Sequence, residues 1–63
     1  MNIEFKRCRH IHHNVAVYVA IYKNEVIEMN EFYASKVEFF VRANPILTDS
    51  ELWNGIKKIT NQA

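Results

Sequence analysis

The feature that most constrains this chain is its first 44 residues, which contain no glycine and no proline. Within them, apolar side chains recur at steps of three or four from Val15 to Phe40, which is the spacing of one face of an amphipathic helix. Asn14 can cap such a helix at its start. Asn44-Pro45 ends it, because proline disfavours helical geometry in the residue before it. The pattern predicts a long helix over residues 14–43.

A second, shorter helix is predicted over residues 48–60. Thr48 and Glu51 have the spacing of a capping box, in which each side chain bonds the other residue's backbone amide. Gly55 costs about 1 kcal/mol inside a helix, which is acceptable if it lets another helix come close. Because the loop between the two helices is short, we expect them to be antiparallel neighbours.

The segment Val15–Tyr22 also fits a strand, since its sequence VAVYVAIY is rich in β-branched and aromatic residues. Lys23-Asn24 would then turn the chain into a second strand over Glu25–Met29. A two-residue hairpin turn prefers glycine, however, and a strand here would show apolar residues on both faces. We therefore favour an all-α, two-helix hairpin, and an α+β fold with an N-terminal β-hairpin is the alternative.

Residues 1–13 are interpreted as a basic arm that precedes the helical hairpin of residues 14–63, and together they make a single small domain. Ile3 and Phe5 alternate with charged residues, a weak strand pattern. Two apolar residues cannot anchor a strand without a neighbour, so we expect the arm to be irregular or helical. The cations that could contact a phosphate backbone are Lys6, Arg7 and Arg9.

The lengths of the two predicted helices indicate self-association. Thirty helical residues span about 45 Å and thirteen span about 20 Å, so the short helix covers only half of the long one. The predicted core within the chain is Phe32, Val37, Phe40, Leu52, Trp53, Ile56 and Ile59. The apolar side chains left over would be covered by a second copy with the same stripe, in a dimer or trimer. The expected interface between copies is Val15, Tyr18, Val19, Tyr22, Val26 and Met29.

Few side chains in the sequence suggest chemistry. The cluster Cys8, His10, His12 and His13 contains good zinc-ligand types, but the two-to-four-residue gaps of zinc sites are missing. We expect a polar arm with no cofactor, and whether the cluster ever binds a metal stays open. No nucleophile has a base beside it, which predicts a protein that is not an enzyme.

Charge and hydropathy limit which partners the chain can bind and in which cell compartment it is expected. A net charge of only +1 gives no strong overall field toward nucleic acid. The longest apolar run, Val15–Tyr22, is far shorter than the ~20 residues of a membrane-spanning helix. A lone cysteine and the lack of an export signal favour the cytoplasm.

The segment EFYASKVEFFVRANPILTDSELWNGIKKI, together with the 63-residue size, resembles the small early open reading frames between the exonuclease and excisionase genes of lambdoid bacteriophages. This resemblance implies a phage accessory or regulatory protein of the bacterial host cytoplasm. The expected function is a non-enzymatic homo-oligomer that acts on a host or phage protein. The alternative is a small nucleic-acid-binding module that uses the basic arm.

Overall fold

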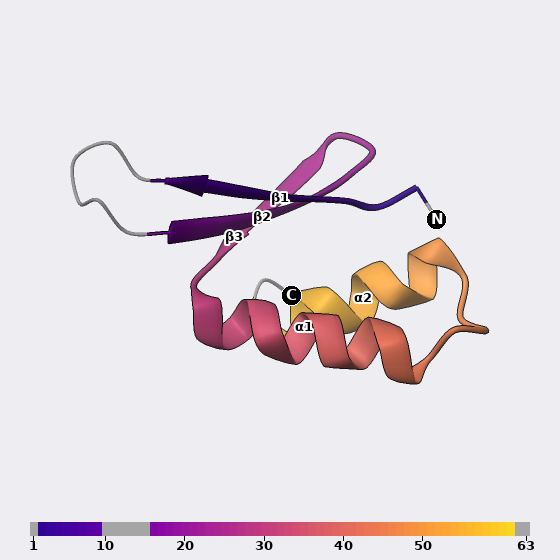
Figure 1. Cartoon of the computed structure of the whole chain (residues 1–63). Coiled ribbons are helices and arrows are strands. Elements are labelled where there is room, and N and C mark those ends of the chain that lie inside the picture. Colours follow the sequence, from indigo (N-terminus) through magenta and orange to yellow (C-terminus); the bar gives the residue numbers. More distant parts are fainter. Residues whose placement is uncertain (1, 10–15, 62–63) are drawn as a thin grey trace.

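The computed structural model describes residues 2–9 and 16–61 and has an α+β fold (Figure 1). Within these residues, three antiparallel strands lie side by side in chain order: β1 (Glu4–Arg9), β2 (Ala16–Tyr22) and β3 (Glu25–Met29). Two helices, α1 (Glu31–Ala43) and α2 (Asp49–Ile59), cover one face of the sheet. The all-α prediction is therefore wrong, and the alternative with an N-terminal β-hairpin describes the fold.

The predicted long helix over 14–43 exists only from Glu31 onward, because the described residues before it form strands. β2 is the central strand, so apolar residues on both of its faces are compatible with a sheet, and its β-branched side chains favour one. The β2–β3 turn needs no glycine, since Lys23 itself adopts the left-handed conformation with φ of 54°. The two arguments raised against a hairpin therefore do not hold.

The basic arm also differs from its prediction, because residues 4–9 are strand β1. They pair with β2 in antiparallel register, from Glu4 opposite Ile21 to Arg9 opposite Ala16. This pairing supplies the neighbour that the sequence interpretation lacked, and Ile3 is buried in the core just before the strand.

The core lies between the sheet and the two helices. Its buried members are Ile3, Ala20, Ile27, Met29, Val37, Leu52, Trp53 and Ile56, and Tyr18, Tyr22, Phe40 and Ile59 pack against them half-buried. Phe32, expected in the core, is 61% exposed because it lies at the surface of an open groove, where Lys36 Nζ is 4.5 Å from the centre of its ring. Tyr18, Tyr22 and Met29 were expected to contact a second copy, but they face the chain's own helices. Val15 lies outside the described residues.

The signals at the ends of the helices are confirmed from Glu31 onward. The capping box is present, with Thr48 N donating to Glu51 Oε1 at 3.0 Å and Glu51 N donating to Thr48 Oγ1 at 3.2 Å. α1 ends just before Asn44. Its N-cap is Asn30, whose Oδ1 accepts from the backbone N–H of Tyr33 at 2.9 Å. The predicted cap Asn14 lies outside the described residues.

Gly55 does allow a close approach between the helices, as the sequence indicates. α2 runs back beside α1 (Figure 1), and the ring of Phe40 occupies the space where a side chain at position 55 would begin. In the described part of the chain, no helix has the length and apolar content needed to cross a membrane.

Candidate nucleic-acid interface

The positive charge of the molecule is concentrated on strand β1. This strand carries Lys6, Arg7 and Arg9 against the single acid Glu4, whereas the rest of the chain carries five cations and six acids. β1 is an edge strand, and all six of its residues are exposed. The cations predicted to contact nucleic acid are therefore held on one strand with access to solvent.

β1 and β2 form a two-stranded ribbon at one end of the sheet. The last pair between β2 and β3 is Tyr18 opposite Met29, whereas β1 and β2 continue to Arg9 opposite Ala16. This end lies near the start of α1, away from the β2–β3 turn (Figure 1). The pairs beyond β3 are Cys8 opposite Val17 and Arg9 opposite Ala16, and the major groove of duplex DNA admits a two-stranded β-ribbon.

Strand alternation divides the cations between the two faces of the ribbon. Arg7 lies opposite Tyr18 in the register, on the face that carries the helices, and Arg9 follows it on the same face about 6.8 Å along the strand. The guanidinium carbon of Arg7 lies 5.7 Å from the centre of the Tyr18 ring. This cation–π contact orients the guanidinium while its edge stays able to donate to an anion.

Lys6 lies on the opposite face of the ribbon, where its Nζ is 3.9 Å from a carboxylate oxygen of Glu4. Both side chains are more than half exposed. An exposed pair of this kind contributes about 0–1 kcal/mol, so the ammonium can exchange Glu4 for a phosphate at little cost.

A groove of about 640 Å³ separates β1 from α1, and its charged lining residues are Lys6, Arg7, Arg42, Glu31 and Glu38. Arg42 forms the i,i+4 ion pair expected from the sequence, with 2.9 Å between its Nη2 and Glu38 Oε1. The α1 side of the groove therefore carries acids beside its one cation, whereas the β1 side carries only cations. A polyanion is favoured along β1.

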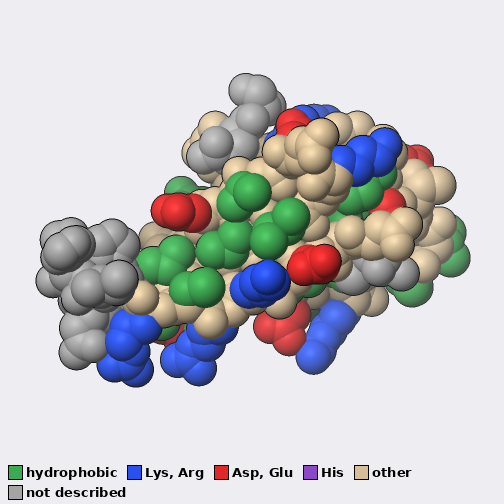
Figure 2. All heavy atoms as spheres, turned by 90° about the horizontal axis from the view of Figure 1, so that it is seen from above, with side chains coloured by type: hydrophobic (Ala, Val, Ile, Leu, Met, Phe, Trp, Pro, Cys, Tyr) green, Lys and Arg blue, Asp and Glu red, His purple; other side chains and the backbone are tan. Residues whose placement is uncertain are grey.

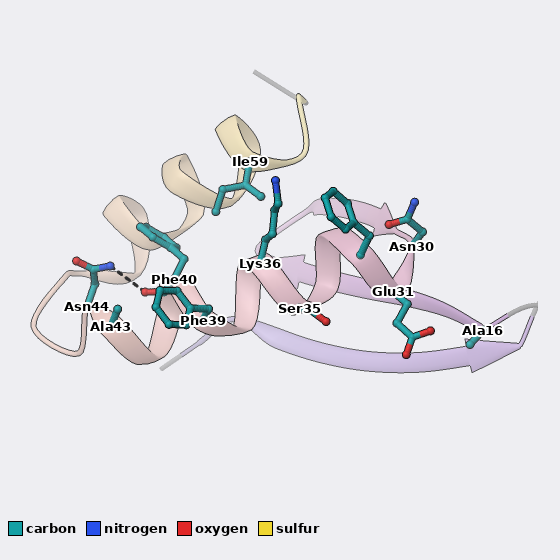
Figure 3. A pocket seen from close by; sticks show the side chains of 11 residues that line it. Ala16, Asn30, Glu31, Ser35, Lys36, Phe39, Phe40, Ala43, Asn44 and Ile59 are labelled. Atoms are coloured by element: carbon teal, nitrogen blue, oxygen red, sulfur yellow. Dashed lines mark hydrogen bonds between the residues drawn. The ribbon is translucent and has the colours of Figure 1, made fainter.

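A larger groove of about 960 Å³ runs along α1 on the side away from β1, and Figure 3 shows its lining. Phe39, Phe40 and Ile59 make most of it apolar, and the Asn44 side-chain amide at one end donates to the backbone oxygen of Phe40 at 2.8 Å. The charged residues of the lining are Glu31 and Lys36.

The described residues contain no group of three side chains that could hold a metal ion. Cys8 is exposed on β1. His10, His12 and His13 lie outside the described residues, so metal binding by that cluster stays untested.

A polar cluster near the β2–β3 turn ties the sheet to α2. The Glu25 carboxylate accepts from Trp53 Nε1 at 2.6 Å and lies 3.0 Å from Lys57 Nζ. The hydrogen bond from Lys57 first, and then that from Trp53, lower the pKa of Glu25 below its usual value. The cluster is explained by this structural role, because it fastens the start of β3 to the last helix.

The Glu25 cluster makes stability depend on pH in a defined direction. A carboxylate whose pKa is lowered by folding stabilises the folded state above its unfolded pKa, and this contribution is lost as the pH falls. We expect the thermal midpoint to fall as the pH drops below about 4.5, and Glu25→Gln to show a smaller fall. Circular dichroism melts at pH 7 and pH 3 would measure both. Equal falls in the two proteins would contradict the prediction.

Sequence reasoning identified the three cations but missed the strand that carries them. The signal was present in two parts, since Ile3 and Phe5 alternate with charged residues and VAVYVAIY is a suitable partner strand. Treating the second segment as a helix removed the partner of the first, so the ribbon was not recognised.

Comparisons of this chain with protein-family models, with curated proteins and with solved structures give no significant match.

Proposed function

We propose that this protein is a small nucleic-acid-binding module that contacts the phosphate backbone of duplex DNA through the β1–β2 ribbon. The observation that carries the proposal is the placement of Lys6, Arg7 and Arg9 on one exposed edge strand, whose last residue, Arg9, lies where β1 and β2 continue beyond β3. Cations held on a rigid strand release the counterions of the DNA without ordering a flexible segment. The expected contacts are with phosphates, which position a protein but carry no sequence information.

The arrangement of the side chains supports three contacts. Arg7 is oriented by Tyr18 from the neighbouring strand, and Arg9 extends the same face toward the end of the ribbon. Lys6 lies on the opposite face of β1, where its weak ion pair with Glu4 leaves the ammonium group able to contact a phosphate. Guanidinium groups suit this role, because their planar donors match the oxygens of a phosphate.

The experiment is a fluorescence anisotropy titration of a labelled 20-base-pair duplex of mixed sequence at about 50 and 200 mM salt. Three phosphate contacts predict a slope of about −2.7 in a plot of log affinity against log salt, or roughly a 40-fold loss over this range. The double variant Arg7→Gln/Arg9→Gln removes two contacts, so its slope should become shallower by about 2.

The matched control is Lys36→Gln/Lys58→Gln, which removes the same charge from exposed positions on the helices. It should keep a slope close to that of the unaltered protein. If the control loses as much affinity as the arginine variant, binding follows net charge and the ribbon is not the interface. The absence of binding at 50 mM salt would overturn the proposal altogether.

The expectation of an accessory protein that acts on a host or phage protein rests on the resemblance of its sequence alone. It stays a prediction, as does the bacterial cytoplasm as its location. The nucleic-acid proposal is preferred because the exposed cations of β1 support it.

A further inference from the structure

The face of the sheet away from the helices carries a second feature, an apolar patch that the nucleic-acid proposal does not use, although Lys6 lies beside it. Alternation along β2 turns Val17, Val19 and Ile21 to this face, and β3 adds Val26, which is 62% exposed. These four residues are called the outer patch. In Figure 2, which looks onto this face, hydrophobic side chains gather over the sheet, with basic side chains along one edge. The charged residues that border this apolar area give it the arrangement of an interaction site, in which an apolar centre is rimmed by polar side chains.

The charges beside the outer patch have a defined order. In the register, Lys6 lies opposite Val19 on one side and Glu28 lies opposite Val19 on the other. Residues directly opposite one another point to the same face of a sheet. Across the middle of the outer face, the side chains from β1 to β3 are therefore a cation (Lys6), a valine (Val19) and an anion (Glu28). Glu4 lies two residues before Lys6 on β1, points to the same face and pairs weakly with it.

This order selects one way for two copies to stack face to face. If the two-fold axis runs parallel to β2, each Lys6 lies over Glu28 of the other copy, and the two Val19 side chains meet at the axis. If the axis runs across the strands, Lys6 lies over Lys6 and Glu28 over Glu28. Stacked sheets are about 10 Å apart, a gap that a lysine and a glutamate side chain span together. Charge complementarity therefore favours the first arrangement.

We propose that a second copy of this chain covers the outer patch, in a two-fold sandwich with parallel β2 strands and Lys6 of each copy facing Glu28 of the other. Three strands about 4.8 Å apart and five residues long give a footprint of roughly 250 Å² per copy. This is well below the roughly 800 Å² per partner of a standard specific interface, so the dimer is weak and its population rises with concentration. Arg7 and Arg9 lie on the opposite face and remain accessible in it, whereas Lys6 is covered, so the three phosphate contacts proposed above belong to the monomer.

Sedimentation velocity from about 10 µM to 1 mM at 50 mM salt tests the dimer. The mass should rise from 7.5 kDa toward twice that value. Lys6→Glu and Glu28→Lys should each raise the dissociation constant at least tenfold, because each creates two like-charge pairs. The double variant Lys6→Glu/Glu28→Lys should return it to within about threefold of the original. A monomer throughout this range would overturn the proposal.

Two controls separate the interface from other causes. Val19→Thr keeps a β-branched side chain, so the fold should be retained by circular dichroism while dimerisation weakens at least tenfold. Arg7→Gln/Arg9→Gln should leave the mass unchanged, so a failure of nucleic-acid binding is distinguishable from a failure of dimerisation. If the single charge variants dimerise like the original chain, Lys6 does not face Glu28 of the other copy and the proposed arrangement is overturned.

Discussion

Replacing Trp53 with alanine should leave the isolated protein largely unfolded. Trp53 is 2% exposed, its ring centre lies 5.5 Å from that of Tyr22, and its Nε1 donates to Glu25. Truncating a buried tryptophan costs about 3–5 kcal/mol. The whole stability of a 63-residue domain is roughly 3–9 kcal/mol. The loss is therefore comparable to the total, and guanidinium denaturation followed by circular dichroism at 222 nm would measure it.

Two control variants define the cause of this effect. Trp53→Phe keeps an aromatic ring but no donor, so its loss should be clearly smaller than that of Trp53→Ala. Phe39→Ala removes an aromatic side chain that is 76% exposed, and its free energy of unfolding should stay within about 0.5 kcal/mol of the original. The packing described for α2 would be incorrect if Trp53→Ala unfolded at the same denaturant concentration as the unaltered chain.

Gly55→Ala should destabilise the protein, although alanine is the better helix former. Alanine gains about 1 kcal/mol over glycine inside a helix. Its Cβ, however, would overlap the outer ring atoms of Phe40 on the neighbouring helix. Overpacking of this kind costs about 1–3 kcal/mol. Three atoms of the Phe40 ring, Cζ, Cε1 and Cε2, lie close to this position, so the whole ring must move. We expect a net loss of up to about 2 kcal/mol in the free energy of unfolding.

A double-mutant cycle provides the control for Gly55. In a Phe40→Leu background the ring is absent, so Gly55→Ala should become neutral or stabilising. The difference between the two backgrounds isolates the contact between ring and helix. A stabilising effect of Gly55→Ala in the unaltered chain would show that the two helices are farther apart than described here.

The second half of the fold could be predicted from sequence because its signals are local. The capping box of Thr48 and Glu51 and the stop at Asn44-Pro45 act within a few residues, and the structure confirms both. The sheet could not be settled in this way. VAVYVAIY is apolar at helical and at strand spacing, and only its pairing with residues 4–9 and 25–29 decides between them.

The candidate interface was also only partly predictable, because it combines local signals with long-range pairing. Lys6, Arg7 and Arg9 are evident from composition, but their exposure on an edge strand depends on long-range pairing. The core prediction succeeded for Leu52, Trp53 and Ile56, which repeat at the spacing of a short helix. The assignment of Tyr18 and Tyr22 to an interface between copies followed from the assumed helix, because a strand places alternate residues on opposite faces.

The chain order of the elements has a consequence for biosynthesis. β2 is apolar on both sides, and the two helices that cover its inner face are translated after it. Until both helices have formed, the new polypeptide presents a β-prone segment that can pair with other copies. Variants that weaken the packing of α2, such as Trp53→Ala, should therefore increase the fraction recovered in inclusion bodies.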